Sequence, residues 1–377
     1  MSTNRSYSTL NLWQRVGITI LGTVAIALLL WLLAGHWPPG IDYHVYYFPA
    51  GRMWLDHDPA LQQFYSNDFH APWIVWLSGA FAIWGYSLGK AWLWLISVVC
   101  LIYGIITFSR PGRPRGWSVI FSLFNFHTYD LLFRGQIDAF NVLGVTLAWT
   151  ALNKRQPWLL GLAYLSMMMK PPNSIPIAIF FLWLSWQWWT IRQVITTLVI
   201  PGVVFIISLI AAPTWLLEIA QNIKVPIGFN AWVTTIWRAQ QILGISWIIP
   251  TIIVATAVGL AIWAWLHTDR ISEETRRLAQ MMLVISLTFV ITPYSLSYQF
   301  VLLLAVVMPY LAGWRLEVYM LLYVLTFLPI LRIFIGIGNT WIDIIFVFAV
   351  FATTIVCLIQ PHRDRQMGWV PEPAKPD

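Results

Sequence analysis

Long apolar runs recur along the whole chain, and many of them are long enough to cross a lipid bilayer. A helix needs about 20 mainly apolar residues to span the hydrocarbon core. The mean hydropathy is +0.70 and only 10% of the residues are charged, far fewer than in a soluble domain. The runs are continuous rather than alternating, which favours helices over the strands of a membrane barrel. The sequence therefore predicts an all-α, polytopic membrane protein.

Twelve membrane spans fit the apolar pattern best, and basic residues predict their orientation. The expected spans are 13–34, 91–108, 117–132, 138–152, 157–170, 174–189, 193–212, 245–267, 278–295, 297–312, 316–335 and 342–360. The basic runs at 110–115 and 153–155 then share one side, which the positive-inside rule makes cytoplasmic. The segment 71–85, at about fifteen residues, is short for a span and is expected to form a juxtamembrane or re-entrant outer helix. This arrangement predicts a plasma-membrane protein with both termini in the cytoplasm.

A single transmembrane domain, residues 1–360, is expected to account for nearly the whole chain. Two long outer loops follow from the span assignment, at about 35–90 and 213–244. The tail 361–377 is polar and rich in proline, which predicts disorder. The first apolar run lacks a cleavage site, so it is expected to be retained as a helix. The net charge of +7 is explained by basic cytoplasmic loops, without any nucleic-acid partner.

The first outer loop concentrates ionisable side chains in a chain that has only 15 Asp and Glu among 377 residues. Its acidic and histidine residues are Asp42, His44, Asp56, His57, Asp58, Asp68 and His70. Ionisable groups beside a bilayer are energetically costly and usually functional. The loop therefore predicts a site at the outer membrane surface.

Asp42 has two interpretations that residue type alone leaves open. It could act as a general base that takes a proton from an acceptor hydroxyl, or it could cap the helix expected over 46–55. The aromatic residues beside it are Tyr43, Tyr46, Tyr47 and Phe48. Such rings suit sugar stacking and hydrogen bonding, and they equally suit an interfacial aromatic belt. The aromatic run favours a ligand surface around Asp42.

The remaining acidic residues of the loop favour structural roles. Asp56, His57 and Asp58 are adjacent, and adjacent side chains seldom converge on one metal ion. We interpret them as the start of a loop. Asp68 and His70 could orient a substrate or mark a turn, and for His70 the structural role is favoured.

Several basic residues fall on the outer side, against the positive-inside bias. They include Arg134, Lys170, Lys224 and Arg238. Cations beside acidic groups predict an anionic ligand, and phosphate is the natural candidate because Arg and Lys bind its oxygens. Contact with lipid headgroups is the alternative for any single one. Two prolines follow Lys170 and fix it at a helix break, while Asp130 is expected to pair with Arg134 at (i, i+4).

The chain carries none of the common soluble nucleotide-binding or hydrolase motifs. An activated substrate would therefore have to come from the membrane, as a lipid. A transporter or flippase is the main alternative class, but it would need polar groups through the bilayer depth and usually a repeated architecture. A non-catalytic membrane subunit is a third possibility.

Taken in order, these motifs resemble the GT-C superfamily of membrane glycosyltransferases. The chain is most similar to the bacterial polyprenyl-phosphate-mannose-dependent α-mannosyltransferases and their uncharacterised relatives. The likeness covers roughly residues 12–312 and is carried by Asp42 in its loop, by Gly-Gln-Ile-Asp-Ala-Phe-Asn at 135–141, and by Lys170-Pro171. One departure lies at 292–299, where the family's Trp and His positions hold Leu, Tyr and Gln.

The resemblance implies a reaction and a set of site residues. Such enzymes move a monosaccharide, here mannose or another hexose, from a polyprenyl-phosphate donor to a lipid or glycan acceptor at the outer face, with inversion. No cofactor or metal is expected, and Asp42 matches the family's catalytic base. Residues expected to bind the donor or its phosphate are Tyr43, His44, Arg134, Gln136, Lys170, Arg238, Tyr298 and Gln299.

Overall fold

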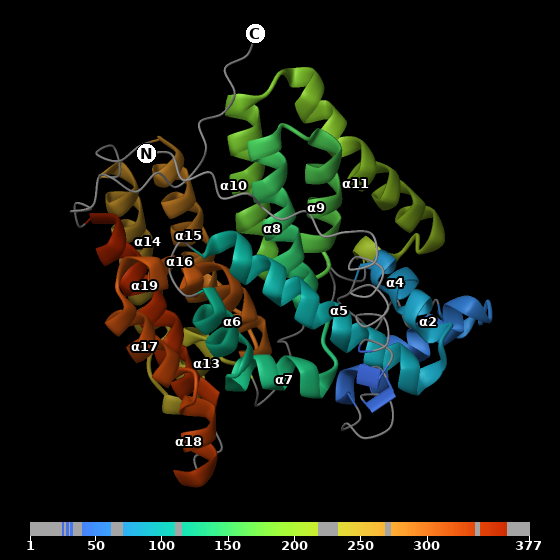
Figure 1. The fold of residues 1–377 in the computed structure, drawn as a ribbon, viewed down its shortest axis with the longest axis horizontal. Helices are drawn as coiled ribbons and strands as arrows, with labels where there is room; N and C mark the ends of the chain where they lie inside the picture. The colour runs from blue at the N-terminus through green and yellow to red at the C-terminus, as the bar shows by residue number, and fades with distance from the viewer. Residues whose placement is uncertain are drawn as a thin grey trace, which may run out of the picture.

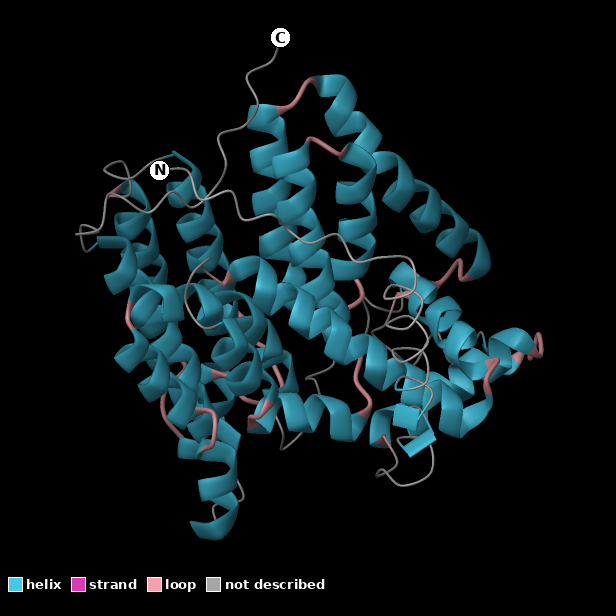
Figure 2. Cartoon of the chain, in the orientation of Figure 1, coloured by secondary structure: helices cyan, strands magenta, loops and turns pink. Residues whose placement is uncertain are grey.

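The computed structural model describes residues 40–61, 71–109, 115–217, 233–267, 273–335 and 340–359, with a few positions between 25 and 32. Within these ranges the chain is helical, as Figure 2 shows, and the one extended pairing is an isolated bridge between Val233 and Leu296. The expectation of an all-α protein is confirmed for the described residues.

Within the described residues, the helices follow one another through short connections (Figure 1). The first half contains η1 (Tyr43–Tyr47), α2 (Phe48–Leu55), α4 (Pro72–Ala82), α5 (Gly85–Phe108), α6 (Arg115–Leu123), α7 (Phe126–Arg134), α8 (Ala139–Lys154), α9 (Pro157–Met167) and α10 (Pro171–Trp188). The second half contains α11 (Ile191–Ala211), α13 (Ile236–Leu243), α14 (Ile248–Leu266), α15 (Glu273–Ile291), η3 (Ser297–Phe300), η4 (Leu303–Val307), α16 (Met308–Trp314), α17 (Leu316–Leu325), α18 (Leu328–Ile335), η5 (Thr340–Asp343) and α19 (Ile344–Ile359).

Four helical segments in the described part of the chain are long and apolar enough to cross a membrane. They are Gly85–Phe108, Ile191–Ala211, Ile248–Leu266 and the continuous run Ser297–Trp314. Large apolar side chains on α11 and α14 are exposed, among them Ile206, Ile210 and Ile262. Exposed apolar helices of this length are suited to a lipid environment. They support the prediction that the chain is a membrane protein.

Helices α8 and α9 form an antiparallel pair at the centre of the fold. Arg155 ends α8 in the left-handed conformation, with φ of 52°, and Pro157 begins α9 two residues later. Gly144 lies against α9, where an added Cβ would come within 2.8 Å of the backbone nitrogen of Met167. Small residues at such contacts let membrane helices approach closely. Because the pair is antiparallel, the start of α8 and the end of α9 lie at the same end of the bundle.

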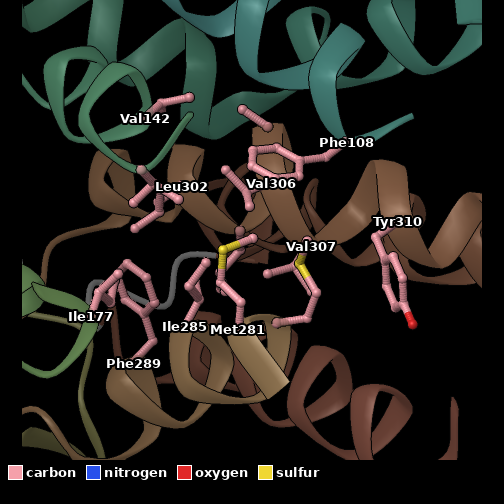
Figure 3. Close-up of a cluster of buried hydrophobic side chains, with 14 of the residues drawn as sticks. Phe108, Val142, Ile177, Met281, Ile285, Phe289, Leu302, Val306, Val307 and Tyr310 are labelled. Atoms are coloured by element: carbon pink, nitrogen blue, oxygen red, sulfur yellow. The ribbon is translucent and has the colours of Figure 1, made fainter. Parts of the chain in front are cut away.

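The main hydrophobic core surrounds the π-helical segment η4 (Figure 3). Val306 and Val307 are fully buried there, between Phe108 of α5 on one side and Met281 and Ile285 of α15 on the other. The central position of η4 explains why the run Ser297–Trp314, although apolar, is mostly inside the protein.

The segment predicted to be the first outer loop contains a compact helical unit beside α5. Gly51 of α2 packs on α4 so closely that a Cβ would lie 2.5 Å from the carbonyl oxygen of Ser78. The apolar segment expected as a short helix at 71–85 is α4, which ends at Ala82, before α5 begins at Gly85. Residues 85–90, which were expected at the end of the first outer loop, belong to α5.

Two expected spans are interrupted, and the one at 316–335 is divided into α17 and α18. The prediction of a single helix over 117–132 is wrong, because the chain forms α6 and α7 with a break at Asn125. The Asn125 side chain accepts a hydrogen bond from the backbone nitrogen of Thr128 at 3.0 Å. Asn is a favoured N-cap residue, so α7 starts afresh and runs to Arg134.

Candidate functional site

The site forms where the start of η1 meets the turn between α7 and α8. Gly135 ends α7 with φ of 67°, a conformation that glycine adopts without strain. An added Cβ at Gly135 would lie 2.8 Å from the Cβ of Tyr43, and Gly40 approaches the same turn. Two glycines therefore allow the segments to touch, and the contact brings Asp42 next to Gln136.

Asp42 turns its carboxylate toward Gln136 and away from its own helix. It occupies the position before η1 but makes no side-chain capping bond there. Its Oδ2 accepts a hydrogen bond from Nε2 of Gln136, a residue 94 positions later. The helix-capping interpretation of Asp42 is therefore wrong, and its partner is a long-range one.

Gln136 is the centre of a buried polar network. Its Oε1 accepts bonds from the hydroxyl of Tyr47 at 3.0 Å and from Nζ of Lys170 at 2.5 Å. With both acceptor bonds made, its amide nitrogen is the end that faces Asp42. The π-helical turn of η1 contributes to this geometry, because Asp42 and Tyr47, five residues apart, both reach the same amide.

Lys170 forms a buried ion pair with Asp138. The distance from its Nζ to Oδ2 of Asp138 is 2.6 Å, and the two side chains are 10% and 2% exposed. The Lys170 ammonium also lies 4.7 Å from the ring centroid of Tyr298. Lys170 therefore already has a carboxylate partner, because Asp138 at the start of α8 faces the residue that precedes α10.

Arg134 is held beside this network by a second ion pair. Its Nε donates to Oδ1 of Asp130 at 2.7 Å, which confirms the expected (i, i+4) pair. Oδ2 of Asp130 accepts a bond from the Ser297 hydroxyl at 2.5 Å. The guanidinium carbon lies 5.8 Å from the Tyr298 centroid. Arg134 and Lys170 therefore both lie around the ring of Tyr298.

Burial raises the pKa of the Asp42 carboxyl above its ordinary value of 3.8. The hydrogen bond from Gln136 and the charges of Arg134 and Lys170 act in the opposite direction without cancelling that effect. Removal from water penalises the charged form. A carboxylate with a raised pKa is a better proton acceptor than an ordinary surface aspartate, once it is ionised.

Four of the expected ligand-binding residues have other surroundings. Tyr43 is fully buried among Phe48 and Tyr86, and its expected contact with a ligand stays a prediction. Gln299 is buried, where it accepts a bond from Asn173 at 2.6 Å.

The other two are nearer the surface. His44 is exposed, with its ring edge-on to Tyr86. Arg238 lies on α13 and donates to Gln241 at 3.4 Å on the same helix.

The acidic triplet at the end of α2 is a surface turn. Asp56 pairs with Arg52 at 3.1 Å, and these two side chains are 55% and 48% exposed. Asp58 accepts a bond from the backbone nitrogen of Ala60 at 2.8 Å. The interpretation of this triplet as loop structure agrees with these local contacts. Asp68, His70 and Lys224 lie outside the described residues.

Three members of the network went unrecognised in the sequence as functional partners. They are Asp138, Tyr47 as a hydrogen-bond donor, and Ser297. Asp138 carried a signal, since it flanks Gln136 in the segment that resembles the family motif. Within the described residues, no group of three His, Cys, Asp or Glu side chains converges as a metal site would require.

Comparisons with protein-family models, with curated proteins and with solved structures gave no significant match to this chain. The chemistry of the site therefore carries the functional argument.

Proposed function

We propose that the protein is an inverting glycosyltransferase that moves a hexose from a polyprenyl-phosphate donor to a lipid-linked or glycan acceptor. The observation that carries the proposal is the orientation of Asp42. Its carboxylate leaves its own helix terminus uncapped and faces Gln136 across the structure. A carboxylate that is partly withdrawn from water and oriented by a fixed donor is suited to general-base chemistry.

In the proposed reaction, Asp42 takes the proton of an acceptor hydroxyl. The acceptor oxygen attacks the anomeric carbon of the donor sugar as the bond from that carbon to the phosphate oxygen breaks. Attack opposite the leaving group inverts the configuration, and polyprenyl phosphate leaves with its negative charge. Gln136 keeps the carboxylate aimed, because its own oxygen is fixed by Tyr47 and Lys170.

The leaving phosphate needs positive charge, and two cations stand near Asp42. Arg134 and Lys170 both lie around the Tyr298 ring. Each already has a carboxylate partner, so a phosphate would share these cations with Asp130 and Asp138. Charge that develops on the leaving group is stabilised by donors already in place.

The proposed topology has twelve spans, cytoplasmic termini and the site at the outer face of a plasma membrane. Lys154 ends α8 and Arg155 follows it in the α8–α9 turn, while Arg192 is the second residue of α11, next to the α10–α11 turn. Both turns lie at the top of Figure 1. The Asp42 network lies at the opposite end of α8, which supports an outer position under the positive-inside rule.

Purified protein should be incubated with a panel of polyprenyl-phosphate hexoses and a lipid acceptor extract, with mass analysis of products. The proposal predicts release of polyprenyl phosphate together with a product one hexose heavier than its acceptor. Movement of intact donor between the leaflets of a vesicle, without cleavage, would contradict the proposal and identify a flippase.

A further inference from the structure

Three buried oxygen atoms around the first turn of α10 have no hydrogen-bond partner among the described residues. They are Oδ1 of Asp138, Oδ1 of Asn173 and Oγ of Ser174, on side chains that are at most 2% exposed. A buried polar atom without a partner costs free energy that a bound group can recover. Such atoms close together indicate a place where a ligand supplies the missing bonds.

The contacts of these residues place them in one neighbourhood. Asp138 bonds Lys170, the residue before α10. Asn173 in the first turn of α10 bonds Gln299, whose neighbour Tyr298 has its ring 4.7 Å from the Lys170 ammonium. The helix N-terminus itself offers few donors, because its first two residues are prolines without an N–H group.

The charges and atom types identify the ligand chemistry. Carboxylate and amide oxygens only accept hydrogen bonds, so the ligand must donate them. An anion would be repelled by Asp138, and a cation would be repelled by Lys170. A neutral group with several hydroxyls satisfies all three oxygens without either penalty.

We propose that Asp138, Asn173 and Ser174 form a subsite that binds the hydroxyl groups of the transferred sugar. The proposal rests on the proposed function, and it assigns sugar selection to these residues while proton transfer belongs to Asp42. The three oxygens are buried, so side chains must move before a sugar can bind. Such a movement affects the rate of binding, and the affinity is therefore measured at equilibrium.

Ser174→Ala is the sharpest test, because the Ser174 hydroxyl has no hydrogen-bond partner among the described residues to lose. Full-length protein in lipid nanodiscs would be titrated with polyprenyl-phosphate mannose and with polyprenyl phosphate that carries no sugar. The variant should bind the sugar-bearing lipid about five-fold more weakly, the loss of one neutral hydrogen bond. Its affinity for the sugar-free lipid should stay the same, and its melting temperature should not fall, because the removed hydroxyl is buried without a partner among the described residues.

Ser166→Ala on α9 is the matched control, since the Ser166 hydroxyl donates to the carbonyl oxygen of Phe140 at 2.5 Å. It should lower the melting temperature and leave the ratio of the two affinities unchanged. Asn173→Ala is a second variant, and it should likewise weaken the binding of the sugar-bearing lipid alone.

Two results would overturn the subsite, and they are distinguishable. If wild-type protein transfers the sugar but Ser174→Ala and Asn173→Ala keep the wild-type ratio of affinities, the subsite is wrong and the proposed function stands. If wild-type protein binds neither lipid, the proposed function fails and the subsite fails with it.

Discussion

Two acidic regions of the segment predicted to be the first outer loop have similar residues and opposite surroundings. Asp42 is half-buried and bonds Gln136, which is 94 residues away in the chain. Asp56 is exposed and pairs with Arg52, four residues earlier on the same helix. An exposed local pair is already satisfied and is screened by water. Under the proposed function, the contrast indicates that a carboxylate gains a chemical role from a distant partner that the fold supplies.

Replacement of one carboxylate oxygen by an amide nitrogen should separate the two regions most clearly, because it should change the rate of sugar transfer in one region only. Asp42→Asn should reduce sugar transfer by about 10³-fold, because the variant cannot accept the acceptor's proton. Asp56→Asn makes the same chemical change in the surface turn and should transfer at the wild-type rate. Initial rates of polyprenyl phosphate release measure both. Equal rates for the two variants would contradict the assignment of Asp42.

Removal of the buried cation should destabilise the network from within. Lys170→Met leaves the Asp138 carboxylate buried without its ion-pair partner, which should cost about 3 kcal/mol or more. The double variant Lys170→Met/Asp138→Asn removes both charges and should recover part of that loss. Denaturant unfolding of the two variants in detergent measures the difference. A single variant as stable as wild type would show that the pair is not structurally important.

The smallest effect is expected in the surface turn. Arg52→Ala breaks the exposed pair with Asp56, and such pairs contribute about 0–1 kcal/mol. The change in unfolding free energy should therefore be a fraction of the change for Lys170→Met, and it should vanish at high salt. A loss of several kcal/mol would mean that the turn is packed in a way the exposed fractions do not indicate.

Local patterns in the sequence predicted local structure well. Apolar composition indicated a helical membrane protein, and the short run at 71–85 indicated the helix α4. The Asp130–Arg134 pair followed from (i, i+4) spacing alone. The break at Asn125 also had a local signal, since Asn is a common N-cap, but the apolar residues on either side concealed it.

The partners within the site could not be predicted from the sequence in the same way. Lys170 and Asp138 are 32 residues apart, and their contact depends on how α8, α9 and α10 pack. The burial of Tyr43 likewise follows from the close approach of Gly40 and Gly135, which no pattern within either segment reveals. Residue types suggested the proposed chemistry, and packing decided which residues lie together.

The central claim, that Asp42 is the base, is tested most directly by the pH dependence of kcat/KM in wild type and in Gln136→Ala. Below its pKa, Asp42 is protonated and cannot accept a proton, so activity should fall on the acid side. Burial raises the pKa of Asp42 above 3.8, and the bond from Gln136 lowers it. The wild-type acid limb should therefore lie above 3.8 and move to still higher pH in Gln136→Ala. An acid limb that stays in the same place when Gln136 is removed would contradict the account.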